Sequence, residues 1–386
     1  MERSETTSLF AEFRHADPAF SPVPLWWWSG EPLDPARLRW QLERYREGGV
    51  RNLVVINLAP TGPLYGHHAD DPPFMSEQWW TIFRGVCADA RELGMRIWFY
   101  DQIGFSGANI QGGLIARHPA FAGMTLERVS VVAHGRAEVA CPPNGVGLCA
   151  TVTPLDGHDR PAGRPIRVPV SGGTATWEGN GRARLSLFYT VPRGFDYLSP
   201  EACAALLDTI HGEFERRAGE FFGDVIVGSF QDELPPMPRW SAGFARAFER
   251  MHGYDLVPLL EGLWEDLGGE ERRIRRDYHA TRAALAEAAF FRPLFAWHDE
   301  RGLLCGVDQQ GPARAGDPAG TVAIYADYLR THRWFGAPGS DHHGEPKIHA
   351  SLAHLYGRER VWLEGFHTSG WGGTLEETFD WLLPWL

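Results

Sequence analysis

The sequence predicts an α/β fold of the (β/α)8 TIM-type barrel, with a small β-rich insertion after its third strand. Apolar segments of strand composition alternate with amphipathic helical segments along most of the chain. Residues 122–198 interrupt this alternation with the two-residue period that is typical of paired strands. Polar and acidic residues directly follow most of the predicted parallel strands, as expected at the carboxyl-terminal face of such a barrel.

The alternation predicts strands with helices between them. Asp34 followed by Pro35 marks the start of the first helix, and Gly94 marks the end of the second. The predicted strands span residues 23–28, 52–58, 95–100, 224–233, 303–307, 334–339 and 359–363. A closed barrel of this type needs one strand more, so either the chain is a fragment or the count is one short.

The predicted organisation has three parts. Residues 1–121 form the first part of the barrel, residues 122–198 form the β-rich insertion, and residues 199–386 form the remainder of the barrel without its eighth strand. Inside the insertion, segments with the period of strands lie at residues 129–133, 147–153, 165–170 and 184–191.

The composition excludes several classes of protein. A net charge of −12, with no run rich in Lys or Arg, argues against binding to nucleic acid. No apolar run approaches the 18 or so residues of a membrane span, and the amino-terminal residues do not resemble a secretory signal, so we expect a cytoplasmic protein. The 5 cysteines lack metal-ligand spacing and are expected to be reduced thiols.

Two acidic residues, Glu233 and Glu364, each end an apolar strand-like segment. Such an arrangement is costly unless the acid emerges into a functional cleft. Two such acids on different strands of one α/β domain predict paired general acid and base catalysis of the glycosidase kind. The alternatives are that Glu233 belongs to a helix start, and that Glu364 is structural. Pro235 and Pro236 favour a fixed loop over a helix start.

Further polar and aromatic residues are expected at the same face. The sequence has 16 tryptophans, which serve either as core fillers or as flat platforms for sugar rings. The segment 341–349 contains three histidines and two acids, so a zinc site is an alternative, although substrate binding is favoured. The predicted substrate-binding residues are Trp27, Trp28, Asp101, Gln102, Asp232, Asp308, Asp341, His342, His367 and Trp371.

Several motifs resemble glycoside hydrolase family 106, the α-L-rhamnosidase group, over most of the chain from Pro24 onward. The motifs are Pro-Leu-Trp-Trp-Trp-Ser-Gly at 24–30, the stretch 90–107, Phe-Gln-Asp-Glu at 230–233, Pro-Gly-Ser-Asp-His at 338–342, the stretch 351–358, Leu363-Glu364 and Gly370-Trp371. The resemblance implies a (β/α)8 barrel and inverting hydrolysis of terminal α-L-rhamnosides. It also implies that Glu233 is the general acid and that Glu364 is the general base. No cofactor follows from the residues themselves, and the resemblance allows a dependence on calcium.

The sequence departs from this family in two respects. Gln102 replaces the acidic residue that usually follows Tyr-Asp in the family, which puts a charge or metal role of that position in doubt. Relatives are also longer, since they continue through an eighth strand into β-sandwich domains. The alternatives that stay open are another exo-glycosidase of the same barrel type and a truncated, inactive carbohydrate-binding barrel. The oligomeric state is not predicted.

Overall fold

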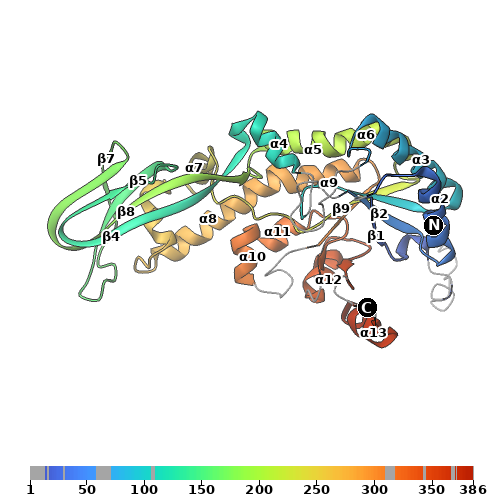
Figure 1. Ribbon diagram of the computed structural model, residues 1–386. Coiled ribbons are helices and arrows are strands. Elements are labelled where there is room, and N and C mark those ends of the chain that lie inside the picture. Colours follow the sequence, from blue (N-terminus) through green and yellow to red (C-terminus); the bar gives the residue numbers. More distant parts are fainter. Residues whose placement is uncertain are drawn as a thin grey trace, which may run out of the picture.

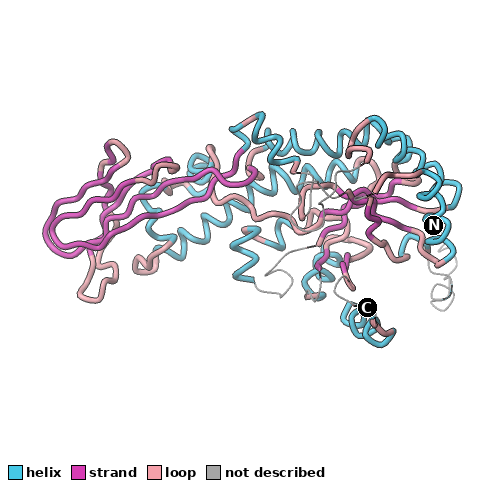
Figure 2. The backbone as a smooth tube through the Cα atoms, in the orientation of Figure 1, coloured by secondary structure: helices cyan, strands magenta, loops and turns pink. Residues whose placement is uncertain are grey.

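The computed structural model describes residues 14, 17–28, 31–57, 71–105, 109–308, 318–341, 345–366, 370 and 372–385. A parallel sheet with helices along its outer face forms the body of the molecule, and a long antiparallel sheet projects from it (Figures 1 and 2). The predicted α/β class with a β-rich insertion is therefore confirmed. No helix in the described part of the chain is both long and apolar enough to cross a membrane.

The body contains a five-stranded parallel sheet in the order β1-β2-β3-β9-β10. Its strands are β1 (Leu25–Trp27), β2 (Asn52–Ile56), β3 (Arg96–Tyr100), β9 (Ile226–Gln231) and β10 (Leu304–Val307). Two further strands, β11 (Gly339–Asp341) and β12 (Trp362–Glu364), form a separate parallel pair. A single parallel bridge between Gly306 and Ala337 connects β10 to the segment just before β11.

The helices between these strands pack on the outer face of the sheet (Figure 1). Several begin with the caps that the sequence predicts, since the Asp34 and Ser76 side chains accept hydrogen bonds from Arg37 N and Trp79 N. The helices are α2 (Pro35–Glu47), α3 (Glu77–Leu93), α4 (Ile110–Arg117), α5 (Pro200–Leu207), α6 (Glu213–Ala218), α7 (Phe244–His252), α8 (Glu270–Ala286), α9 (Arg292–Asp299), α10 (Pro318–Tyr325), α11 (Tyr328–His332), α12 (Pro346–Leu355) and α13 (Leu375–Leu382).

The sheet buries a separate core on each face, because successive strand residues point to opposite sides. In β3, Ile97 and Phe99 pack with the helices, whereas Trp98 and Tyr100 belong to an inner core. The Trp362 side chain of β12 crosses to this inner core, where its ring stacks on Phe230 at 4.8 Å between centroids. The sheet therefore encloses an inner core, as the sheet of a barrel does.

The hydrogen-bond ladder does not close into a barrel within the described residues. β12 pairs with β11 and no described pairing joins it to β1, so the barrel that the sequence predicts, with its eighth strand missing, is not closed by hydrogen bonds. The predicted strand at 334–339 is also misplaced, because α11 and the turn after it run to residue 334 and β11 begins only at Gly339. The apolar residues 334–337 suggested a strand, but Trp334 and Phe335 pack in the core between sheet and helices. The strand pairing of this segment is limited to the bridge between Ala337 and Gly306.

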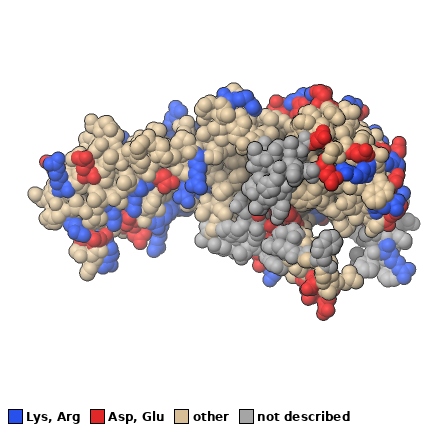
Figure 3. All heavy atoms as spheres, viewed as in Figure 1, with Lys and Arg blue, Asp and Glu red and all other residues tan. Residues whose placement is uncertain are grey.

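The projecting sheet, here called the β arm, comprises the strands from β4 to β8. Its long antiparallel pair, β4 (Ala122–Ala140) with β8 (Thr174–Phe195), contains the predicted segments 129–133 and 184–191 and extends well beyond them. β5 (Val146–Pro154), β6 (Ile166–Val168) and β7 (Val170–Ser171) complete the arm. Charges of both signs are interspersed on the visible face of the arm, which carries no single acidic patch there (Figure 3).

Glycines on the inner face of the sheet make room for the large aromatic rings. A Cβ added at Gly306 would lie 2.5 Å from the Trp362 ring, so we expect Gly306→Ala to lower the free energy of unfolding by about 1–3 kcal/mol through overpacking. The matched control is Gly85→Ala in α3, where a Cβ meets nothing within 4 Å and should stabilise the helix by about 0.5–1 kcal/mol. Chemical denaturation measures both, and equal effects would contradict this account of the inner core.

Candidate active site

Four carboxylates lie at the carboxyl ends of neighbouring strands. Asp232 directly follows β9, Asp308 directly follows β10, and Asp341 and Glu364 are the last residues of β11 and β12. The strand register pairs Asp341 with Glu364 and places Val307 beside Gln231. The predicted positions of these acids after strands are therefore found in the structure, at one end of the parallel strands.

The carboxylates of Asp232, Asp308 and Glu364 converge closely. Each offers an oxygen atom, and these atoms all lie within 4.8 Å of one another. Asp308 is fully buried, and burial is the main cause that raises its pKa well above the ordinary value, followed by the negative charges of Asp232, Glu364 and Asp341. A proton is therefore retained in this cluster at a pH where isolated carboxyls would be ionised.

Hydrogen bonding indicates which carboxyl groups share that proton. Oδ2 of Asp308 is buried and has no donor when its neighbours are ionised. A proton shared between Asp308 and Asp232 supplies the missing hydrogen bond. The Tyr100 hydroxyl donates to Oδ2 of Asp232 at 3.2 Å and also to the carbonyl of Phe105. Tyr100, a residue of the inner aromatic core, therefore connects that core to the carboxylate cluster.

Glu233 lies beside this cluster and is held by its main chain. Its backbone N–H donates to Oδ1 of Asp308 at 2.7 Å, and its φ of 31° is positive, which is unusual and strained for a residue with a side chain. The Tyr325 hydroxyl donates to the carbonyl of the next residue, Leu234, at 3.1 Å. Glu233 and Glu364 are both partly exposed, so of these acids they are the ones most open to a ligand.

Two predicted substrate-binding residues are buried within the protein. The Asp101 carboxylate is fully buried and accepts hydrogen bonds from Ile103 N at 2.9 Å and Gln231 Nε2 at 2.8 Å, and burial raises its pKa to about 7. Gln102 is 1% exposed and donates to the Asn57 carbonyl at 3.1 Å. Burial therefore leaves these two side chains little surface for contact with a ligand. Their hydrogen bonds stabilise the ends of the strands.

The tryptophans after the first strand differ from each other. Trp27 is 45% exposed and is available as a platform, whereas Trp28 is 2% exposed and packs against Trp26, Trp79 and Phe83. The platform interpretation is therefore wrong for Trp28, which fills the core between sheet and helices. The other predicted binding residues, His342, His367 and Trp371, lie outside the described residues.

Sequence comparison does not assign this chain to a family. No protein-family model matches the sequence, and no curated protein matches it. Comparison of structures does give a result. The fold is similar to that of a solved glycoside hydrolase, a rhamnosidase. A rhamnosidase from Novosphingobium sp. PP1Y superposes with a TM-score of 0.65 and 13% sequence identity, covering 98% of this chain and 55% of that chain.

A β-galactosidase from the psychrophilic Marinomonas ef1 is a more distant match, with a TM-score of 0.46 and 12% identity over 89% of this chain and 48% of that chain. The chain thus spans about half the length of these solved structures. At this level of identity the rhamnosidase likeness establishes the fold alone, and the chemistry has to be argued from the residues.

The calcium ion that the family resemblance implies is compatible with the carboxylate cluster. Calcium prefers several oxygen ligands, among which carboxylates are the commonest charged ones. Asp232, Asp308 and Glu364 offer three such ligands within 4.8 Å of one another, and the buried Oδ2 of Asp308 lacks a hydrogen-bond donor. The zinc alternative has less support, because both ring nitrogens of His349 already contact protein partners, Tyr328 and Glu345.

Residues that fix the site were missed by the sequence reasoning. Arg282, 1% exposed in α8, donates to the carbonyls of Met237 and Pro238 and so anchors the chain just after Glu233. Tyr100 supports Asp232 from the inner core. The alternation in β3 places Tyr100 on the face opposite Phe99, so the sequence could have predicted that Tyr100 belongs to the inner core. Nothing in the sequence points to Arg282.

Proposed function

We propose that this chain carries the active site of a glycoside hydrolase, an inverting, exo-acting α-L-rhamnosidase with Glu233 as general acid and Glu364 as general base. The observation that carries the proposal is that two partly exposed glutamates flank a buried, proton-retaining aspartate at the carboxyl ends of parallel strands. The fold likeness to a solved rhamnosidase and the family 106 motifs support the choice of sugar.

In this mechanism Glu233 donates its proton to the glycosidic oxygen as the bond from the anomeric carbon to that oxygen breaks. A water molecule attacks the anomeric carbon from the opposite face, and Glu364 accepts a proton from that water. The sugar leaves with inverted configuration, the aglycone leaves as an alcohol, and proton exchange with solvent restores both acids.

The remaining residues have binding roles in the proposal. Asp232 and Asp341, each 6% exposed, and the exposed ring of Trp27 would contact the sugar, together with His342, His367 and Trp371. A bound calcium ion would be held by Asp232, Asp308 and Glu364 and would supply a positive charge for sugar hydroxyls. Glu364 would then both bind the ion and accept a proton from the attacking water.

A second candidate is a retaining glycosidase. Retaining enzymes hold their two carboxyl groups about 5–5.5 Å apart, whereas inverting enzymes need about 6.5–9.5 Å to admit water. Oxygen atoms of Asp232 and Glu364 lie within 4.8 Å of each other, which favours Glu364 as a nucleophile with Asp232 as acid and base. In that scheme Glu233 would position the substrate.

Hydrolysis of aryl glycosides tests the proposal. We expect the protein to release nitrophenol from 4-nitrophenyl α-L-rhamnoside faster than from the α-L-fucoside, β-D-galactoside and α-D-glucoside. The site is proposed to fit the ring-hydroxyl configuration of L-rhamnose, which the fucoside, also a 6-deoxy sugar of the L series, does not share. Each substrate is assayed with added calcium and with a chelator. Equal or greater rates on another glycoside would reject the sugar assignment, and no release from any of them would reject the catalytic proposal for this chain.

A further inference from the structure

A cavity lies away from the carboxylate cluster, between the base of the β arm and the helices behind it. Its volume is about 250 Å³, and none of the candidate active-site residues lines it. The lining comes from β4, the 3-10 helix η5 (Val257–Leu263) and the residue after it, the segment before α7, α8, and α10. The lining residues are Leu126, Arg239, Leu263, Trp264, Arg275, Tyr278, His279, Arg282 and Ala323.

The described charged residues that line this cavity are all cationic. Arg239, Arg275 and Arg282 contribute guanidinium groups, and no Asp or Glu among the described residues belongs to the lining. Arg282 is 1% exposed and donates only to main-chain carbonyls, which satisfy its hydrogen bonds but leave its charge uncompensated. The cavity wall is therefore electropositive although the whole chain carries −12.

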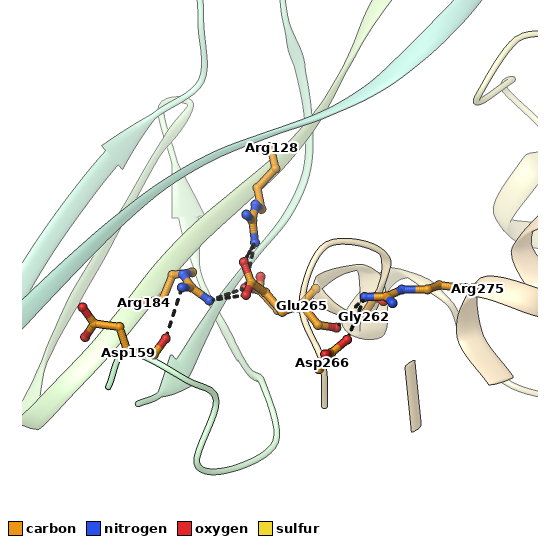
Figure 4. A network of polar contacts seen from close by, with 8 residues as sticks. Arg128, Asp159, Arg184, Gly262, Glu265, Asp266 and Arg275 are labelled. Carbon is orange, nitrogen blue, oxygen red and sulfur yellow. Dashed lines mark hydrogen bonds and ion pairs between the residues drawn. The ribbon is translucent and has the colours of Figure 1, made fainter. Parts of the chain in front are cut away.

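The nearest carboxylates are already engaged elsewhere. Arg128 and Arg184 of the β arm reach Glu265 at 2.8 Å each, and Arg275 of α8 turns toward Gly262 and Asp266 (Figure 4). Arg128 also contacts the buried Glu261 at 3.1 Å. Glu261 and Glu265 compensate the arginines of the arm, Asp266 pairs with Arg275 of the cavity wall, and none of the three acids pairs with Arg239 or Arg282.

Two polar groups at the cavity lack partners. Within the described part of the chain, no carboxylate pairs with the exposed Arg239, and the buried Nδ1 of His279 has no hydrogen-bond partner. Burial, followed by the charges of Arg282 and Arg239, lowers the pKa of His279 to about 4, so this histidine is neutral near pH 7. An anion beside these groups would offset the positive charges of Arg239 and Arg282.

We propose that this cavity is a binding site for a compact ligand that carries one oxyanion on a sugar-sized ring. Arg239 and His279 would contact the oxyanion, Arg275 and Arg282 would supply the surrounding positive charge, and Trp264 and Tyr278 would pack against the ring. A volume of about 250 Å³ lies just below the range of about 300–1,000 Å³ that is typical of drug-sized ligands, so the ligand is small. The site goes beyond the proposed hydrolysis and does not depend on it.

Calorimetric titration with D-glucuronate, D-glucose 6-phosphate and neutral D-glucose tests this site. We expect at least one anion to bind and D-glucose not to bind; which anion binds distinguishes a carboxylate from a phosphate. Arg239→Gln should weaken the binding about tenfold or more through loss of a charge-assisted contact. The matched control is Arg246→Gln, an exposed arginine in α7 outside the cavity, which should leave the affinity unchanged.

A second readout reports directly on the cavity. In protein labelled at its histidine rings, the bound anion should raise the pKa of His279 above about 4, because it offsets the charges of Arg239 and Arg282. Glu364→Gln should bind the anion as the unaltered protein does, which separates this site from the proposed active site. Dissociation constants above about 10 mM for both anions, or equal affinity in Arg239→Gln, would overturn the proposal.

Discussion

Glu233→Gln and Glu364→Gln are each expected to lower kcat/KM on an aryl α-L-rhamnoside by about 10²- to 10⁴-fold, the usual contribution of a general acid or base. Both side chains are partly exposed, and glutamine keeps the size and shape of glutamate, so the amide should fold with nearly unchanged thermal stability. Initial rates and thermal unfolding, measured on the same preparations, check this prediction.

Leaving groups distinguish the two roles. Loss of the acid at Glu233 should slow substrates with poor leaving groups far more than those with good ones, because a good leaving group departs without protonation. Loss of the base at Glu364 should slow both to a similar degree. Glu359→Gln is the matched control, since that side chain is 83% exposed near the start of β12 and should keep full activity. A variant at Glu233 or Glu364 that retains activity would refute the role assigned to it.

Asp101→Asn is expected to stabilise the protein above neutral pH. Burial raises the pKa of Asp101 from 3.8 to about 7, a change that corresponds to on the order of 4 kcal/mol. The folded state keeps this proton at pH values where the unfolded chain has lost it. The free energy of unfolding therefore falls as pH rises from about 4 to about 7, and asparagine, which cannot ionise, removes this loss. When the Gln231 side-chain amide turns over, its Oε1 accepts from the asparagine Nδ2, and this bond replaces the one that Gln231 Nε2 now donates to Asp101.

Denaturation at pH 5 and pH 8 measures this effect. The advantage of Asp101→Asn over the unaltered protein should grow between these values, to on the order of 1–4 kcal/mol at pH 8. Asp196, whose pKa burial raises to about 6, will keep some pH dependence in both proteins. Asp299→Asn, at an exposed position ending α9, should change stability by less than about 0.5 kcal/mol at either pH. If the difference in the free energy of unfolding between Asp101→Asn and the unaltered protein shrinks as pH rises, the buried position of Asp101 is contradicted.

The sequence predicted the strand ends better than the side-chain surroundings. Asp232, Asp308, Asp341 and Glu364 follow apolar segments, and because parallel strands end at one face, their convergence followed from the pattern. The burial of individual side chains could not be predicted from the pattern in the same way. Trp27 and Trp28 are adjacent and chemically identical, yet they face opposite sides of the sheet. Only the register and the packed helices decide which of the two meets solvent.

Contacts between distant segments were also beyond sequence reasoning. The support of the Glu233 loop by Arg282 depends on how α8 packs against residues 237 and 238, and no local pattern encodes that approach. The long β4–β8 pair was predicted as short segments because its solvent-facing residues include glycines and charges that weaken a strand pattern. Cross-strand pairing over its whole length overrides those local preferences.

The anomeric configuration of the first-formed sugar tests the central claim most directly. An aryl α-L-rhamnoside is incubated with the protein, and proton NMR spectra are recorded within minutes, before the product mutarotates. If Glu233 protonates the leaving oxygen while Glu364 activates water on the other face, β-L-rhamnose appears first. Initial release of α-L-rhamnose would contradict this pairing and would point to a covalent intermediate on Glu364.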